Sequence, residues 1–108
     1  MPVYFAFGSN MSVTQMQRRC PTSRLIGCAR LDGHRLAFVG HSKRQGGGVA
    51  TIEPAPGEHV FGAVYTLSEG DVRTLDGYEG HPHTYRRSAR EIRLFREGRR
   101  VPAMVYVH

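Results

Sequence analysis

Short stretches in which apolar and polar residues alternate run through most of the chain. A period of two is typical of β-strands with one buried face, and turn residues separate the stretches. Asp32-Gly33-His34 predicts a hairpin turn between two of them, Pro54-Ala55-Pro56-Gly57 ends another, and Glu97-Gly98 predicts a second hairpin. Strands are therefore expected over residues 3–7, 24–31, 35–41, 49–53, 59–67, 85–95 and 100–107, with a glycine-rich loop over 42–48.

Two segments show helical spacing instead of alternation. Ser12-Val13-Thr14-Gln15 has the form of a capping box, and Met16 and Cys20 follow at helical intervals before Pro21 ends the helix. Ser68-Glu69-Gly70-Asp71 supplies the polar start of a second helix. Many short strands with two short helices and no βαβ repeat predict an α+β fold, built around a mostly antiparallel sheet or small β-barrel.

The second helix carries an acidic residue on its apolar stripe. Val72, Leu75 and Glu79 stand at i, i+3 and i+7, so the Glu79 carboxylate is expected to face the core. Burial disfavours the charged form and raises the pKa of a carboxyl group, which is what a general acid/base at neutral pH requires. The alternative is that the helix frays at Gly77 and leaves Glu79 exposed at its end. Asp76 is expected to face water.

A second candidate site lies where the first strand runs into the first helix, at Gly8-Ser9-Asn10. Such a junction presents unpaired backbone N–H groups, which suit a carboxylate or a developing oxyanion. An ordinary strand-to-helix turn is the alternative, because glycine, serine and asparagine are common turn residues. Tyr65 and Tyr85 are further candidates for lining a pocket, as half-buried aromatic residues whose hydroxyl groups need partners.

The composition limits the class of protein. A chain of 108 residues, 40% of them hydrophobic, is expected to form one domain over residues 1–108. No apolar run approaches the roughly 20 residues that span a bilayer, and Met1-Pro2-Val3-Tyr4 lacks the charged start of a signal peptide, so a cytoplasmic protein is expected. Cys20 and Cys28 are expected to be reduced, buried thiols. His81-Pro82-His83 is expected to be a surface loop, because no cluster of further metal ligands accompanies it.

Positive charge is concentrated in the last predicted hairpin. The formal net charge is +6, and seven of the fourteen arginines lie between Arg86 and Arg100. Dense arginine suits phosphates, so a nucleic-acid interface is one interpretation; the solvated face of two strands is the other, and we favour it. Arg86 and Arg87 point to opposite faces of a strand, so one of them is expected at the rim of a cavity.

Several short motifs also follow the order and spacing of a known family. They are Phe5-Ala6-Phe7-Gly8-Ser9-Asn10, Cys28-Ala29-Arg30-Leu31, Gly47-Gly48-Val49-Ala50-Thr51-Ile52, Pro56-Gly57, Val60-Phe61-Gly62-Ala63-Val64-Tyr65, and Leu75-Asp76-Gly77-Tyr78-Glu79-Gly80 followed by Tyr85. Over essentially the whole chain they resemble the γ-glutamylcyclotransferase family. The resemblance implies an antiparallel, barrel-like α+β fold with a cavity lined by the N-terminal loop and the second helix.

The resemblance also implies roles for particular residues. Phe7-Gly8-Ser9-Asn10 matches the family's Tyr-Gly-Ser-Asn loop, which holds the γ-glutamyl group through backbone N–H groups, and Glu79 matches its catalytic glutamate. Tyr85 is the remaining substrate-binding candidate. Phe7 departs from the family's usual tyrosine and removes a hydroxyl group that could touch substrate. The implied enzyme, an acyltransferase or lyase, needs neither metal nor cofactor.

The implied reaction is intramolecular. The α-amine of a γ-glutamyl amine or amino acid attacks its own γ-carbonyl and releases 5-oxoproline and the free amine, a reaction of glutathione metabolism. Many relatives continue beyond the position of His108 with a further segment, so a lid from a partner chain, and with it a homodimer, is left open. A non-catalytic domain that binds small molecules in the same cavity is the alternative function, and nucleic-acid binding through the arginine hairpin is a third.

Overall fold

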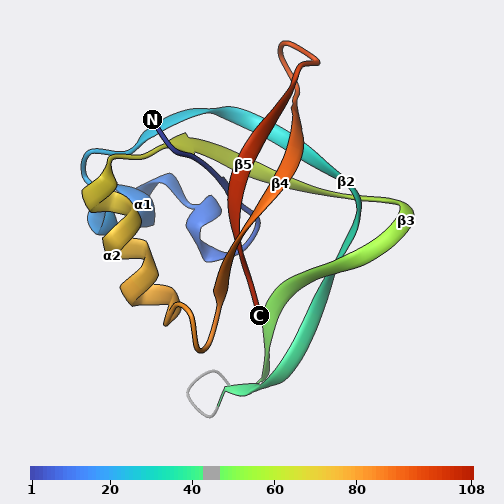
Figure 1. The fold of residues 1–108 in the computed structure, drawn as a ribbon, viewed down its shortest axis with the longest axis horizontal. Coiled ribbons are helices and arrows are strands. Elements are labelled where there is room, and N and C mark those ends of the chain that lie inside the picture. The colour runs from blue at the N-terminus through green and yellow to red at the C-terminus, as the bar shows by residue number, and fades with distance from the viewer. Residues whose placement is uncertain (43–46) are drawn as a thin grey trace.

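The structure is a computed structural model that describes residues 1–42 and 47–108, with side chains outside 40–49. Its strands form a closed barrel in the order β1-β3-β2-β4-β5 (Figure 1). The elements are β1 (Val3–Ala6), the 3-10 turn η1 (Ser9–Met11), α1 (Val13–Arg19), β2 (Arg24–Ser42), β3 (Gly47–Thr66), α2 (Glu69–Glu79), β4 (Arg86–Leu94) and β5 (Arg100–Val107). The predicted α+β class, a small barrel with two short helices, is confirmed. One pairing is parallel, between β1 and β5 at Tyr4 and Met104, so the sheet is mixed.

Strands β2 and β3 form one long hairpin, and the shorter hairpin expected at Asp32-Gly33-His34 is wrong. Both halves of β2 pair with β3 instead, so that Leu31 lies opposite Val60 and Arg35 lies opposite Glu53. The glycine at the centre of the expected turn has φ +73°, a left-handed conformation that here accommodates a shift of register within β2.

The strands and loop expected next to this hairpin change accordingly. Residues 49–53 and 59–67, predicted as two strands, belong to the single strand β3. Of the predicted loop 42–48, both ends belong to β2 and β3, and residues 43–46 lie outside the described part of the chain. Figure 1 shows the two long strands curving together around one side of the barrel.

Both helices begin where their capping residues predict. The Ser12 hydroxyl oxygen accepts a hydrogen bond from the Gln15 backbone N–H (3.3 Å) at the start of α1. At the start of α2, the Ser68 hydroxyl oxygen accepts from the Asp71 N–H (3.1 Å), and the Asp71 carboxylate accepts from the Ser68 N–H (3.0 Å), which completes a capping box. Gly80 ends α2 in the left-handed conformation, with φ 67°.

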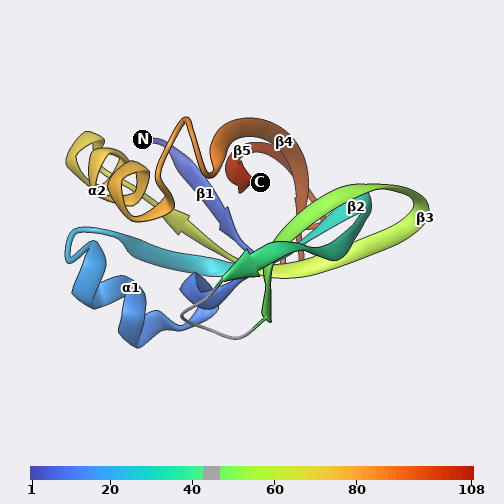
Figure 2. The same ribbon diagram turned by 90° about the horizontal axis from the view of Figure 1, so that it is seen from below.

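Strand β1 separates two hydrophobic clusters, because its side chains alternate between them. Tyr4 and Ala6 pack toward the helices, whereas Phe5 points into the barrel. Both helices lie on the same side of the barrel (Figure 2). The helix-side cluster also contains Met16, Cys20, Ala63, Tyr65, Leu67, Val72, Leu75 and Tyr106, and the barrel cluster contains Ala29, Leu31, Ile52, Val60, Val64, Ile92, Ala103 and Val105. Packing is tight at Gly62, where an added Cβ would lie 2.5 Å from the Ala6 carbonyl oxygen.

The cysteines and histidines that the sequence singles out lie apart from one another. Cys20 is buried and Cys28 is exposed, both as free thiols, so the expectation of two buried cysteines is wrong for Cys28. Cys28 precedes the buried Ala29 on β2 and therefore points to the outer face.

His81-Pro82-His83 lies in the turn after α2. Within residues 1–42 and 47–108, no three His, Cys, Asp or Glu side chains are grouped closely enough to hold a metal ion, and no helix is long and apolar enough to cross a membrane.

Candidate active site

A cavity of about 320 Å³ lies where β1, the turn η1 and the end of α2 come together. Its lining consists of Tyr4, Phe5, Phe7, Gly8, Ser9, Asn10, Ala50, Glu79, Tyr85 and Tyr106. Of the seven residues that the sequence assigns to a site or pocket, all except Tyr65 are among them, although they come from distant parts of the chain. The structure brings these residues together, while their roles in binding and catalysis stay a prediction.

Glu79 is the last residue of α2, and its side chain is half-buried at the cavity. Helix α2 continues unbroken through Gly77, so the alternative in which the helix frays is wrong. Burial raises the pKa of the Glu79 carboxyl group, and the positive charge of Arg19 opposes this rise to a smaller extent. Among the described residues, Glu79 takes part in no ion pair. A carboxyl group in this state is suited to take up a proton and return it.

The Gly8-Ser9-Asn10 segment faces Glu79 from another part of the cavity wall. The backbone hydrogen bonds of this turn run from Met11 N–H to Gly8 O (3.0 Å) and from Ser12 N–H to Ser9 O (3.1 Å). The amides of Gly8, Ser9 and Asn10 precede these donors, at the start of the turn, where a helical turn offers no internal acceptors. The segment lines a cavity that also contains a carboxyl group, and these backbone hydrogen bonds of the turn do not use its three N–H groups.

Asn10 holds this turn in place with its side chain. The residue is 2% exposed, and its Nδ2 donates a hydrogen bond to the Tyr4 hydroxyl (3.1 Å). Its Oδ1 accepts from Gln15 Nε2 (2.9 Å) and Arg19 Nη1 (3.1 Å), while its backbone carbonyl accepts from the Tyr65 hydroxyl (3.0 Å). The Asn10 side chain is therefore occupied by the protein, and its backbone amide is the group left to face a ligand. Tyr65 supports the turn through this hydrogen bond and is not part of the cavity lining.

Arg19 connects the turn to the helix that carries the carboxylate. Its guanidinium group bonds Asn10 and also lies over the ring of Tyr78, 4.3 Å from the ring centre. The sequence analysis does not identify Arg19, but a signal exists: Arg19 lies one helical turn after Gln15, on the face of α1 that meets Asn10. The positive charge that opposes the raised pKa of Glu79 is thus fixed by contacts to η1 and α2.

Three tyrosines form the rest of the polar wall. Tyr4 and Tyr106 meet edge to face with ring centres 5.8 Å apart. The Tyr85 hydroxyl donates a hydrogen bond to the Ala50 carbonyl (2.7 Å), which ties the segment after α2 to β3. Burial raises the pKa of all three phenols, and the negative charge of Glu79 adds to the rise at Tyr4 and Tyr85. These phenols stay protonated and can donate hydrogen bonds throughout the physiological range.

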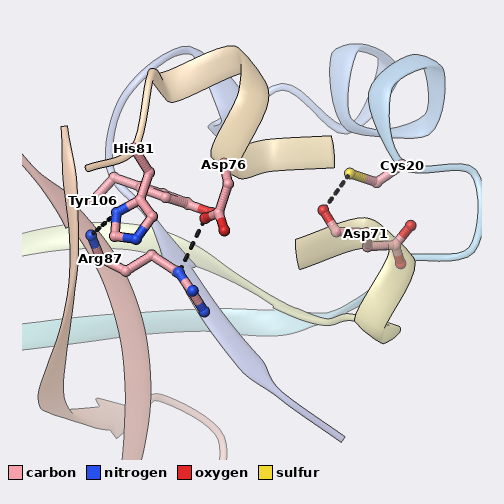
Figure 3. Close-up of polar contacts among 6 residues, drawn as sticks. All are labelled: Cys20, Asp71, Asp76, His81, Arg87 and Tyr106. Atoms are coloured by element: carbon pink, nitrogen blue, oxygen red, sulfur yellow. Dashed lines mark hydrogen bonds and ion pairs between the residues drawn. The ribbon is translucent and has the colours of Figure 1, made fainter. Parts of the chain in front are cut away.

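Behind the cavity, Asp76 is tied to two strands (Figure 3). Its Oδ1 accepts a hydrogen bond from the Tyr106 hydroxyl (2.7 Å) and pairs with Arg87 Nε (3.0 Å). The expectation that Asp76 simply faces water is therefore wrong. Neither Arg86 nor Arg87 lines the cavity, so the arginine expected at its rim is not found there. The backbone N–H of Arg87 donates to Nδ1 of His81 (3.1 Å), which gives that histidine a structural contact.

The closed barrel brings the Gly8-Ser9-Asn10 turn, a half-buried carboxyl group and three tyrosines to one cavity, an arrangement suited to a small polar molecule. Residues 4–108 match the family model described as "Gamma-glutamyl cyclotransferase, AIG2-like". The chain belongs to this family.

Individual relatives agree with this assignment. The γ-glutamylcyclotransferases of mouse and human are each 35% identical to the chain over 82 residues, which cover 72% of this chain and 44% of the relative. The chain thus spans less than half of the length of these relatives. A solved structure named "Gamma-glutamyl cyclotransferase" superposes with a TM-score of 0.90 at 28% identity, over 98% of this chain and 65% of that one. An uncharacterized human protein superposes with a TM-score of 0.88 at 29% identity, over 97% of this chain and 64% of that one.

Proposed function

We propose that this protein is a cyclotransferase that acts on γ-glutamyl amines or γ-glutamyl amino acids and releases 5-oxoproline. The observation that carries the proposal is the placement of Glu79, half-buried and with a raised pKa, in the same cavity as the Gly8-Ser9-Asn10 amides. The volume of about 320 Å³ lies at the lower end of the range for small-ligand sites. Family membership supports the same reaction class.

In the proposed reaction the substrate supplies its own nucleophile. The α-amino nitrogen bonds to the γ-carbonyl carbon, a five-membered ring closes, and the amide bond to the leaving amine breaks. The attacking ammonium group loses two protons as it becomes the N–H of the ring. Glu79 relays both, one to the leaving nitrogen as the amide bond breaks and one to the released amine, so that no proton is gained or lost overall. The enzyme must therefore hold the γ-glutamyl group in a folded conformation beside the carboxyl group.

The negative oxygen that forms at the γ-carbonyl would be held by the amides of Gly8, Ser9 and Asn10. Donors fixed in advance stabilise such an oxygen without rearranging during the reaction, and the hydrogen bonds of Asn10 provide that rigidity. Tyr4 and Tyr106 close the wall on the helix side and reduce access of water to the reacting carbonyl. In this proposal the domain works in the cytoplasm without a metal ion or cofactor, and a chelator leaves the rate unchanged.

The experiment is an assay of 5-oxoproline release from a panel of γ-glutamyl amino acids, γ-glutamyl amines and glutathione. An α-glutamyl dipeptide is the matched control substrate, because its peptide carbonyl is not the γ-carbonyl that closes this ring. We expect release from at least one γ-glutamyl compound and none from the control. Binding of these compounds without any release, measured by calorimetry, would contradict the enzyme proposal and support a non-catalytic binding domain.

A further inference from the structure

A row of arginines crosses three neighbouring strands on the outer face of the barrel. Arg30 of β2 lies directly opposite Arg93 of β4, and Arg93 lies opposite Arg100 of β5. The residues before and after Arg30, and Ile92 before Arg93, are buried in the barrel, so the arginines of this row point outward. Like charges placed directly opposite on adjacent strands repel, so this row costs stability unless something neutralises it.

Carboxylates neutralise the two ends of the row but not its centre. Arg30 Nε lies 2.7 Å from Asp32 Oδ1. Arg100 Nη1 lies 3.4 Å from Glu91 Oε1, and both of these side chains are more than half exposed, which makes the pair weak. Arg93 has no acidic partner among the described residues, and its Nε is shielded from solvent without a hydrogen-bond acceptor there. A buried donor without a partner is uncommon in folded proteins.

The row borders a second cavity, separate from the one that contains Glu79. This cavity has a volume of about 280 Å³, and its polar lining consists of Asp32, His34, Arg90, Glu91, Arg93 and Arg100. Strands β2 and β4 are paired at two positions, Ala29 with Leu94 and Arg30 with Arg93. The cavity lies beyond these pairs, where the two strands move apart. None of its lining residues is shared with the first cavity.

Arg90 adds a second positive charge, and no carboxylate in the described part of the chain forms an ion pair with it. Its Nη1 donates to the Ser88 hydroxyl and to the Ala89 carbonyl (2.9 Å), and its Nε donates to Nε2 of His34 (3.4 Å). None of these partners is a carboxylate, and they hold the guanidinium group in place without cancelling its charge. Arg90 lies on the inner face of β4, opposite the buried Ala103, and Arg93 lies on its outer face, opposite Arg100. Both residues line this one small cavity at the edge of β4.

We propose that this cavity, here called the β2–β4 arginine pocket, binds a phosphate group, either free phosphate or the phosphoryl group of a small metabolite. A dianion matches two uncompensated guanidinium groups, and their N–H donors fit the oxygens of phosphate in pairs. The cavity admits one such group, whereas a nucleic-acid backbone would need a longer track of positive side chains. A bound anion would also relieve the repulsion along the arginine row.

The test is calorimetric titration with inorganic phosphate and with glycerol 3-phosphate at constant ionic strength, on the wild-type protein and on Arg93→Gln. Arg96→Gln is the matched control, because Arg96 is exposed on the same hairpin, is not part of the pocket and carries the same charge. We expect Arg93→Gln to weaken phosphate binding by about tenfold or more, the scale of one lost charge-assisted hydrogen bond. Arg96→Gln is expected to weaken it by less than about twofold. The two ligands distinguish free phosphate from a metabolite's phosphoryl group.

The variant is expected to fold, since removing Arg93 removes a repulsive neighbour, and the thermal midpoint without ligand checks this. Arg90→Gln tests the same pocket from its other wall and is expected to lose affinity in parallel. Equal losses in Arg93→Gln and Arg96→Gln, or no saturable binding to the wild-type protein, would overturn the proposal. So would tight binding of a single-stranded thymidine oligonucleotide that phosphate does not displace, which would identify the arginines as a nucleic-acid surface.

Discussion

The Tyr106 hydroxyl donates a 2.7 Å hydrogen bond to Asp76, and the acceptor oxygen is also held by Arg87 (Figure 3). Three elements meet at this oxygen: β5 through Tyr106, β4 through Arg87 and α2 through Asp76. Because Asp76 lies less than one helical turn before Glu79, the contact also fixes where α2 places its terminal carboxyl group. The position of the proposed acid/base thus depends on a hydrogen bond and an ion pair to Asp76, a residue that does not line the cavity.

Removing the Tyr106 hydroxyl should therefore loosen α2. Tyr106→Phe is expected to lower the free energy of unfolding by about 1–2 kcal/mol, the scale of a hydrogen bond to a charged group that is partly exposed. Chemical denaturation measures this change. Arg87→Gln is the comparison, and it should cost less than about 1 kcal/mol because the pair is partly exposed. An unchanged stability of Tyr106→Phe would show that the contact is not retained in solution.

Replacing the proposed acid/base tests the chemistry directly. Glu79→Gln keeps the shape of the side chain but cannot transfer a proton, so release of 5-oxoproline should fall by about 100-fold or more. The affinity for a γ-glutamyl compound, measured by calorimetry, should change much less. If turnover is retained in a folded variant, the proton transfers must be assigned to another group.

The raised pKa of Glu79 also predicts a pH dependence. A carboxyl group whose pKa is higher in the folded than in the unfolded protein stabilises the fold fully below the unfolded pKa, and this contribution is lost as the pH rises through the folded pKa. Glu79→Gln should therefore match the wild-type stability in acid and exceed it progressively as the pH rises. If the wild-type protein has the proposed activity, its turnover should fall on the acid side with a midpoint above the ordinary pKa of glutamate. Parallel stability curves for the two proteins would contradict the assigned burial.

Asn10 offers a test of the turn that carries the amides. Asn10→Ala removes three side-chain hydrogen bonds from a residue that is 2% exposed, and it should destabilise the fold by about 2–3 kcal/mol. Gln15→Ala removes one of these partners, the part-buried donor to Asn10 Oδ1, and should lower the free energy of unfolding by about 0.5–1 kcal/mol. Thermal and denaturant unfolding compare the two. Similar small effects for both variants would mean that the turn is held by its backbone alone.

Replacement by alanine is expected to have opposite effects on stability at two glycines. An added Cβ at Gly62 would lie 2.5 Å from the Ala6 carbonyl oxygen and 2.7 Å from the Phe5 ring, so Gly62→Ala should be strongly destabilising. Gly77 lies inside α2 with no atom within 4 Å of an added Cβ, so Gly77→Ala should raise the free energy of unfolding by about 0.5–1 kcal/mol. Thermal unfolding of both variants gives the comparison.

The sequence predicts those parts of the fold that depend on neighbouring residues. Ser12 and Ser68 start the helices because capping is a local interaction, and the stripe that places Glu79 is visible in its spacing from Leu75. The turn at Asp32-Gly33-His34 is predicted wrongly for the converse reason. A glycine with positive φ serves a turn or a bulge equally well, and only pairing with a strand far along the chain decides between them.

In the candidate site too, the sequence predicts the residues that local patterns mark and misses roles that depend on distant contacts. Gly8-Ser9-Asn10 and Glu79 follow from local patterns and from the family's motifs, and the structure places them at one cavity. Arg19 and Asp76 owe their roles to partners on other elements. The only local signal for Arg19 is its spacing from Gln15, and the helix that carries Asp76 does not reveal its partners. The place of Asp76 next to Leu75 predicts that it faces water, whereas its ion pair with Arg87 joins residues that only the barrel brings together.

The parallel pairing of β1 with β5, at Tyr4 and Met104, closes the barrel. The cavity forms only when this closure is complete. A four-residue strand joins the first part of the barrel to the last, and the same strand carries Tyr4 and Phe5 into the cavity wall. A form of the chain in which β1 has left the barrel should therefore no longer hold the Gly8-Ser9-Asn10 turn, Glu79 and Tyr106 at one cavity. A molecule that fits the cavity binds only the complete barrel, so its binding energy should appear in full as resistance of the whole domain to unfolding.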